Sequence, residues 1–182
     1  MSQSPAALRI LGLDPGLRRT GWGVIAVTGN RLRFVAAGCL TPKTDGPLAE
    51  RLTTLFQGVQ AVARDHAVAE AAIEETFVNQ NPRSTLKLGQ ARGVVMVAPA
   101  SLGLSVGEYP ANLIKKSLTG FGHAAKGQMQ HMVTALLPGA DLGKGPGAED
   151  AADALAVAIC HAHHRGAAAR EAGLNAALAG AP

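Results

Sequence analysis

The sequence predicts a mixed α/β fold, in which a five-stranded sheet is flanked by helices. Three β-prone segments joined by tight turns open the chain, at residues 8–14, 20–27 and 31–40, which is the pattern of an antiparallel meander. Amphipathic helical segments then alternate with short apolar segments, which is typical of parallel strands joined by crossover helices. We therefore expect the first three strands to be antiparallel, the later ones to be parallel, and helices on both faces.

The segments after the meander are predicted from their periodicity and their end signals. Pro47 opens an amphipathic helix that runs to about residue 66, and a short apolar strand follows at residues 69–73. Ser84 is the expected N-cap of a helix that runs to about residue 97. Residues 104–106 are the expected fifth strand.

The last third of the chain is predicted to be helical. Helices are expected from near Pro110, at residues 126–137 and at residues 149–164. The Ala/Gly-rich tail, residues 166–182, has little periodic pattern and is expected to be frayed or disordered. One domain is therefore assigned to residues 1–165, with a separate tail after it.

Length and composition favour a folded intracellular protein. The chain has 182 residues, of which 47% are hydrophobic and 16% charged, enough apolar material for a sizeable core. The N-terminus lacks a secretory signal, and no apolar stretch is long enough to span a bilayer. Cys39 and Cys160 fit no metal-binding spacing. We expect a cytoplasmic protein with free thiols and no membrane association.

The turn after the first strand holds the first candidate functional residue. Asp14 ends a buried apolar strand and is followed by Pro15 and Gly16, so its carboxylate should emerge where the sheet meets solvent. Gly12 and Gly16 would let a large ligand approach the backbone there. An ordinary Asp-Pro-Gly turn explains these residues equally well. The metal-binding interpretation therefore depends on partner carboxylates elsewhere.

Glu74 is the first partner candidate. It ends the strand at residues 69–73 as Asp14 ends the first strand, so the two carboxylates would share one edge if these strands are parallel neighbours. Glu75 is the competitor, but the alternation of side chains along a strand sends it to the other face.

Asp150 and Asp153 are the other two candidates. They lie at i and i+3 in the last predicted helix, and therefore on one side of it. Asp150 could simply complement the helix dipole. Asp153, however, is the only charged residue in the apolar run 151–160, and a buried carboxylate needs a cation or a hydrogen-bond partner.

Four carboxylates without clustered Cys or His ligands favour Mg²⁺ or Mn²⁺ over Zn²⁺. Two such ions in one site can activate a water on one side of a phosphodiester and stabilise the leaving oxygen on the other. The middle of the chain, residues 78–140, carries one acid, Glu108, against six basic residues, whereas the whole chain has a net charge of only +4. This imbalance suggests a polyanion held against the metal site. The basic residues are Arg83, Lys87, Arg92, Lys115, Lys116 and Lys126.

Several single residues have two interpretations. Phe77 could be a core residue, but its position before a polar loop favours stacking on a base, which would contribute about 1–3 kcal/mol. Lys126 opens a helix, where a lysine opposes the dipole and an anionic ligand would compensate. Lys115 and Lys116 point differently, so one of them could be a plain surface charge.

Histidines and arginines near the candidate site are given the simpler interpretation. His161, His163 and His164 lie at a helix C-terminus, where protonated histidine is favourable without any metal. Arg18 and Arg19 lie close to Asp14 and could touch phosphates, but a surface position is the default for them.

Together these segments resemble one protein family. The stretches LGLDPG, TGWG, AIEETF, LKLGQARG, HMV and EDAADALAVAICHAHHR occur in this order between residues 8 and 164. They resemble the bacterial crossover-junction endodeoxyribonucleases, the Holliday-junction resolvase family RuvC. Trp22, where the family often has tyrosine, and the tail after Gly166 depart from the shared pattern.

The resemblance implies a ribonuclease H-like fold and a homodimer with two metal ions, Mg²⁺ or Mn²⁺, in each active site. It implies symmetric nicks in two strands of like polarity in a four-way DNA junction, which leave 5′-phosphate and 3′-hydroxyl ends. It also implies a branch-migration motor of the RuvA and RuvB type as partner. Its catalytic and metal-binding acids fall on Asp14, Glu74, Asp150 and Asp153.

The DNA contacts are partly implied by the resemblance. Lys115 and Lys126 fall on basic residues near the junction phosphates, and Phe77 falls on an aromatic residue placed against unstacked bases. The helix that carries Gly89 and Gly93 is our candidate dimer interface, because small residues at i and i+4 permit close approach of another helix.

Two other functions are compatible with parts of the sequence. Asp14-Pro15-Gly16 followed by Thr20-Gly21 loosely echoes the phosphate-binding turn of actin-like and sugar-kinase ATPases. Such enzymes need a second domain of similar size, for which 182 residues leave no room. The other alternative is a junction-binding scaffold without catalysis, which the complete set of four acids disfavours.

Overall fold

The fold is known from a computed structural model, which describes residues 7–75, 81–123, 125–142 and 145–179, with the backbone alone for residues 126 and 167–179. The predicted order of strands and helices is confirmed. The elements are β1 (Leu8–Asp14), β2 (Thr20–Thr28), β3 (Arg31–Leu40), α1 (Leu48–Asp65), β4 (Glu70–Glu75), α2 (Pro82–Ala100), β5 (Ser105–Pro110), α3 (Ala111–Thr119), α4 (Lys126–Leu136) and α5 (Ala148–Ala179).

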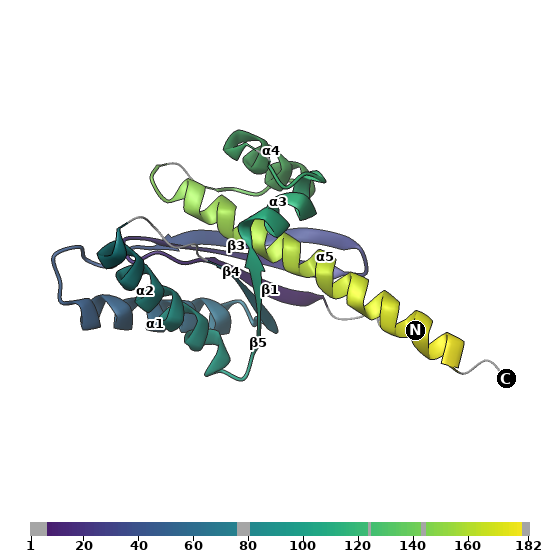
Figure 1. The fold of residues 1–182 in the computed structure, drawn as a ribbon, viewed down its shortest axis with the longest axis horizontal. Helices are drawn as coiled ribbons and strands as arrows, with labels where there is room; N and C mark the ends of the chain where they lie inside the picture. Colours follow the sequence, from purple (N-terminus) through teal and green to yellow (C-terminus); the bar gives the residue numbers. More distant parts are fainter. Residues whose placement is uncertain (1–6, 76–80, 124, 143–144, 180–182) are drawn as a thin grey trace.

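The five strands form one mixed sheet in the order β3-β2-β1-β4-β5. Strand β1 pairs antiparallel with β2, and β2 pairs antiparallel with β3. The pairs β1–β4 and β4–β5 are parallel, as predicted from the crossover helices. Helices α1 and α2 cover one face of this sheet, and α3, α4 and α5 cover the other (Figure 1).

Both faces of the sheet are buried beneath helices. Neighbouring residues of each central strand point to opposite faces and therefore belong to different cores. In β1, Ile10 packs in the core beneath α5, whereas Leu11 packs in the core beneath α1 and α2. In β4, Ala72 belongs to the first core and Ile73 to the second. The near-continuous apolar runs in β1 and β4 thus reflect burial on both sides.

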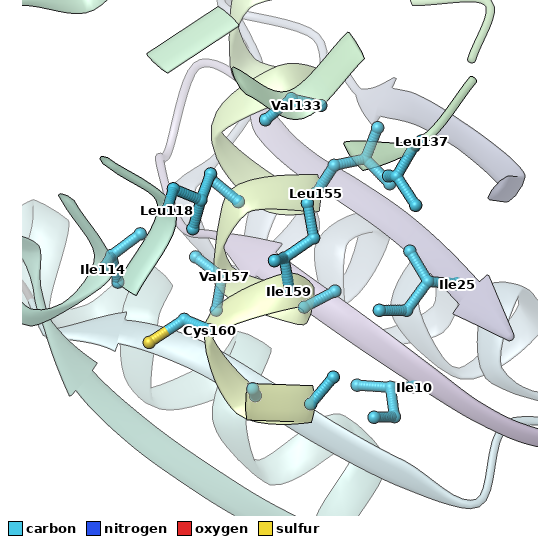
Figure 2. Packing of buried hydrophobic residues seen from close by; sticks show 14 of the residues in the cluster. Ile10, Ile25, Ile114, Leu118, Val133, Leu137, Leu155, Val157, Ile159 and Cys160 are labelled. Carbon is cyan, nitrogen blue, oxygen red and sulfur yellow. The ribbon is translucent and has the colours of Figure 1, made fainter. Parts of the chain in front are cut away.

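Helix α5 lies directly on the sheet because glycines remove the side chains that would hold it off. A Cβ built on Gly12 would lie 2.0 Å from the carbonyl oxygen of Ala154 and 2.6 Å from the amide nitrogen of Ala158. Gly12 therefore admits the helix, and our expectation that it admits a ligand was wrong. Figure 2 shows Leu155 and Ile159 of α5 lying over the strands, near Ile25 and Ile10.

Three local expectations differ from the structure. Asn81, not Ser84, caps α2: its side chain accepts hydrogen bonds from the backbone N–H groups of Arg83 and Ser84. An Asn with Pro directly after it is as good an N-cap signal as Ser. Strand β5 is longer than the predicted 104–106, because parallel pairing with β4 continues to Pro110.

The third difference concerns the tail. Helix α5 does not end near His164 but continues as helix to Ala179, and Figure 1 shows its last turns extending beyond the sheet. Alanine is the best helix former, so an Ala-rich segment can continue a helix that begins in the core even without an apolar stripe. None of the helices in the described part of the chain is long and apolar enough to cross a membrane.

Candidate active site

Asp14 and Glu74 lie at the same edge of the sheet. Parallel strands β1 and β4 are in register through Leu13 and Ile73, so the two acids are the next residue of each strand. Ala72 faces α5, and side-chain alternation therefore puts Glu74 on the α5 side as well. Glu75 is exposed and points the other way, as the sequence predicted.

Asp153 meets Glu74 across a small cavity of about 250 Å³ beneath α5, which Lys115 also lines. Burial raises the pKa of the Glu74 carboxyl above its usual value, and the charge of Asp153 raises it further. The ammonium of Lys115 acts in the opposite direction and lowers this pKa. Two half-buried acids facing one another beside a lysine make a site that favours a bound cation.

Asp150 lies at the same edge, at the start of α5. Its backbone oxygen would be 1.9 Å from a Cβ on Gly21, and Gly21 pairs with Asp14 in the sheet. The Nε of Arg19 donates a hydrogen bond of 2.7 Å to Asp150 Oδ2. Arg19 thus ties the turn after β1 to the helix that carries two of the candidate acids.

Cys39 lies on the neighbouring strand, close enough to Asp14 and Asp150 for both charges to affect its pKa. It pairs with Gly21 on the side away from Asp14. The pKa of its thiol is raised first by burial and then by the charges of Asp150 and Asp14, whereas the hydrogen bond from Thr41 and the charge of Arg19 lower it. Both acids therefore act on one point at this edge of the sheet. Cys39 and Cys160 are free thiols, as expected.

The four predicted acids thus gather at one edge as two sets: Glu74 with Asp153, and Asp14 with Asp150. Among the described residues, no group of three or more Asp, Glu, His or Cys side chains is close enough to enclose a metal ion. The donor chemistry nevertheless fits Mg²⁺ or Mn²⁺, since oxygen ligands are what these ions prefer. The pKa of Glu74 is raised because its ionised form is unfavourable in this cavity, and a bound cation would stabilise that form.

Arg92, one of the predicted DNA contacts, is bonded within the protein. Its Nε donates to the carbonyl oxygen of Glu74 at 3.2 Å, and its Nη2 forms an ion pair with Glu108. The side chain therefore fixes the end of β4, and with it the position of Glu74. Its contact with DNA remains a prediction.

The other predicted DNA contacts lie near the acids or outside the described residues. Arg83 and Lys87 are exposed at the start of α2, and Lys115 is half-buried at the cavity. Lys126 begins α4, where only its backbone is described, and Phe77 lies outside the described residues. Lys116 is exposed and does not line the cavity that Lys115 lines.

The predicted position of the three histidines at a helix C-terminus was wrong, because α5 continues to Ala179. His161 is 9% exposed, with Nε2 3.0 Å from Glu70 Oε2 and Nδ1 2.9 Å from the hydroxyl of Tyr109. His163 lies with Nδ1 3.0 Å from the hydroxyl of Ser117. Both histidines have hydrogen-bond partners in the protein, and His161 lies at the opposite end of β4 from Glu74.

Sequence reasoning missed two contributors to this region. Arg19 was interpreted as a surface arginine, although an arginine just after the Asp14 turn was a usable signal. Tyr109 is the register partner of Glu74 in β5, and its hydroxyl is hydrogen-bonded to His161 of α5, so it links β5 to α5. No local pattern pointed to that role.

Comparison with known proteins places the chain in a family. The family model described as "Crossover junction endodeoxyribonuclease RuvC" matches residues 10–161. A relative of that name from Xanthobacter autotrophicus is 61% identical over 164 residues, covering 90% of this chain and 95% of the relative. The relative from Azorhizobium caulinodans is 60% identical over 162 residues, covering 89% and 94%.

A solved structure has the same fold. The structure of T. thermophilus RuvC in complex with Holliday junction substrate matches with a TM-score of 0.80 and 30% sequence identity, over 88% of this chain and 96% of that one. The predicted ribonuclease H-like fold is thereby confirmed. Because the family model covers most of the chain and the relatives match nearly end to end, the protein belongs to the RuvC family of crossover junction endodeoxyribonucleases.

Proposed function

We propose that the protein resolves four-way DNA junctions by nicking two strands of like polarity at symmetric positions. The observation that carries this proposal is the family match over residues 10–161, which includes all four acids at the edge of the sheet. The proposed products have 5′-phosphate and 3′-hydroxyl ends. Such ends can be joined by a ligase without further processing.

Membership in this nuclease family implies a dependence on divalent metal ions. The residues that would hold Mg²⁺ or Mn²⁺, two ions in each site, are Asp14, Glu74, Asp150 and Asp153. When bound, these ions supply an activated water and stabilise the leaving oxygen. Asp14 would contribute its carboxylate to this set from β1, the central strand of the sheet.

The basic residues have a separate task in this proposal. Lys115 already lowers the pKa of Glu74, which helps to keep that carboxyl ionised for metal binding. Lys115 and Lys126 would also offset the negative charge of the phosphate at the site. Arg83 and Lys87, exposed on α2, would hold the backbone of a flanking strand, and Phe77 would stack on an unpaired base.

We propose a homodimer formed through α2. Leu86 and Val97 are 64% and 54% exposed, and a Cβ on Gly89 or on Gly93 would meet nothing within 4 Å. These four residues follow the i, i+3, i+7, i+11 spacing of one helix face. A two-fold dimer would present two identical sites to a junction that is itself two-fold.

The proposed function also implies a location and a partner in the cell. A nuclease for recombination intermediates would work in the cytoplasm, where the chromosome lies. A branch-migration motor of the RuvA and RuvB type is the proposed partner there. Co-purification of the protein with such a motor on junction DNA would test this partnership.

The most informative experiment is a cleavage assay with Mg²⁺ or Mn²⁺ on a synthetic four-way junction. Linear duplex of the same sequence and an RNA–DNA hybrid serve as controls. We expect paired nicks in the junction and little cleavage of either control. Equal cleavage of all three substrates would contradict junction selectivity, and junction binding without cleavage would favour a scaffold. ATP hydrolysis without DNA would favour the ATPase alternative.

A further inference from the structure

A second hollow lies beside the candidate acids, between the turn after β1 and the starts of α1 and α2. Its volume is about 870 Å³, more than three times that of the cavity at Glu74. Four cationic side chains line it, and Asp150 is the one acidic residue among those that line it. We call it the arginine groove; its cations are Arg18, Arg19, Arg51 and Lys87.

Arg51 places a fixed positive charge at the wall of the groove. Its Nη2 donates to the carbonyl oxygen of Leu17 at 3.0 Å, which fixes the guanidinium at the wall of the groove. Its Nε is buried, and no atom of the described residues accepts a hydrogen bond from it. A guanidinium held in place beside three other cations favours an anionic ligand, because its positive charge is already oriented.

Arg19 connects the groove to the metal-binding edge. It is ion-paired with Asp150 at 2.7 Å, yet 43% of its side chain is exposed and it also lines the groove. A carboxylate held by a guanidinium binds a divalent cation less well, because both compete for the same oxygens. A phosphate in the groove would in turn attract the guanidinium, for which phosphate is a well-matched bidentate partner.

We propose that the arginine groove binds a backbone phosphate of the junction strand next to the cleaved bond, and that Arg19 couples this binding to metal binding at Asp150. The inference rests on the proposed function, which supplies the DNA strand. With DNA absent, Arg19 holds Asp150. With a phosphate in the groove, Arg19 turns to the phosphate and leaves Asp150 to the metal ion.

The shape and lining of the groove favour a phosphodiester backbone over a nucleobase. Besides Asp150, its polar lining consists of long cationic side chains and the hydroxyl-bearing residues Thr44 and Ser84. No aromatic ring is among the described residues that line it, so a base would find nothing to stack on.

The first test is junction binding in the absence of metal, measured across a range of salt concentrations. Arg18→Gln and Lys87→Gln each remove one cation of the groove, and both residues are exposed, so the fold should persist. Each variant should weaken binding and reduce the slope of log K against log salt by about one phosphate contact. Arg31→Gln, an exposed arginine at the start of β3, is the matched control.

The second test is binding of Mn²⁺ to the DNA-free protein, measured by calorimetry. Arg19→Gln frees Asp150 and should bind Mn²⁺ more tightly than the wild type, by about fivefold or more. Adding junction DNA should tighten Mn²⁺ binding by the wild type but have less effect on Arg19→Gln. Equal Mn²⁺ affinities for the two proteins without DNA would overturn the coupling.

The outcomes separate this inference from the proposed function. If the wild type cleaves junctions but Arg18→Gln and Lys87→Gln bind them as Arg31→Gln does, the groove is not a phosphate site and the nuclease assignment stands. If the groove variants weaken binding but the wild type does not cleave, the groove is supported and the nuclease assignment fails.

Discussion

Glu70 and Glu74 have contrasting surroundings. They lie at opposite ends of β4, and both point to the α5 side of the sheet. Glu70 accepts hydrogen bonds from Arg165 at 2.8 and 2.9 Å and lies 3.0 Å from Nε2 of His161. Glu74 faces another acid, Asp153, whose charge raises its pKa together with burial. The first glutamate is compensated within the protein, whereas the second faces a like charge and is a proposed metal ligand.

We propose that this difference distinguishes a structural acid, Glu70, from a functional one, Glu74. A folded protein gains nothing in stability from holding two carboxylates against each other in a cavity, so their proximity needs another explanation. Metal binding supplies one. The paired end of β4 instead anchors α5 to the sheet, through the contact of His161 with Tyr109 as well as with Glu70.

The largest effect should come from neutralising Asp153, which faces Glu74, and it should be a loss of junction cleavage. Asp153→Asn should lower junction cleavage by at least about a hundredfold, because it removes the charge of a proposed metal ligand. Folding should be unimpaired, since the repulsion with Glu74 is relieved. Cleavage rates and circular dichroism would check both parts. Exposed Asp65→Asn at the end of α1 is the control, and a wild-type rate in Asp153→Asn would refute the assignment.

Helix α5 contacts both ends of β4, so a substitution that displaces α5 should lower both stability and cleavage. Gly12→Ala places a Cβ against backbone atoms of Ala154 and Ala158, which cannot move without moving α5. We expect a loss of about 1–3 kcal/mol in the free energy of unfolding, together with reduced cleavage. Urea denaturation would measure the loss of stability. Gly127→Ala, which meets nothing within 4 Å, should be neutral or stabilising; equal effects of the two changes would argue against tight packing at Gly12.

Neutralising the structural end should cost stability. Glu70→Gln removes the charge that Arg165 and His161 share and should lower the free energy of unfolding by about 1–2 kcal/mol. Metal binding should be unchanged, because the other end of β4 is intact. Chemical denaturation and Mn²⁺ titration would test the two statements. Glu75→Gln, an exposed change on the same strand, should have little effect on stability.

The smallest effect should be a pH-dependent gain in stability from Glu74→Gln. The folded pKa of Glu74 lies above its usual 4.5, so the charged form of this residue destabilises the fold at neutral pH. The variant should therefore melt at a higher temperature than the wild type at neutral pH without metal. The difference should shrink as the pH falls through the raised pKa, because the wild-type carboxyl then becomes protonated. A difference that grows on acidification would contradict the raised pKa.

Much of the fold could be predicted because its signals are local. Apolar runs, amphipathic stripes and proline positions gave the order of all ten elements. Boundaries were less certain where two signals compete, as with Asn81 and Ser84 at the start of α2. Strand β5 was underestimated because its extent follows from pairing with β4 rather than from its own residues.

The candidate acids could also be found in the sequence, because a charge after a buried strand or within an apolar helix stands out. Their partners could not. The ion pair of Arg19 with Asp150 joins residues 131 positions apart, and the contact of His161 with Glu70 joins residues 91 apart. Neither follows from any local pattern.

The sequence by itself determined the element order, the two-sided burial of the central strands and the four acids at the ends of β1, β4 and the start of α5. Only the tertiary structure decided that Glu74 meets Asp153, that Arg19 holds Asp150, and that Gly12 receives α5. The physical reason is that periodicity and end signals act over a few residues. Which charges meet depends instead on how closely, and in which register, one long helix lies across the sheet.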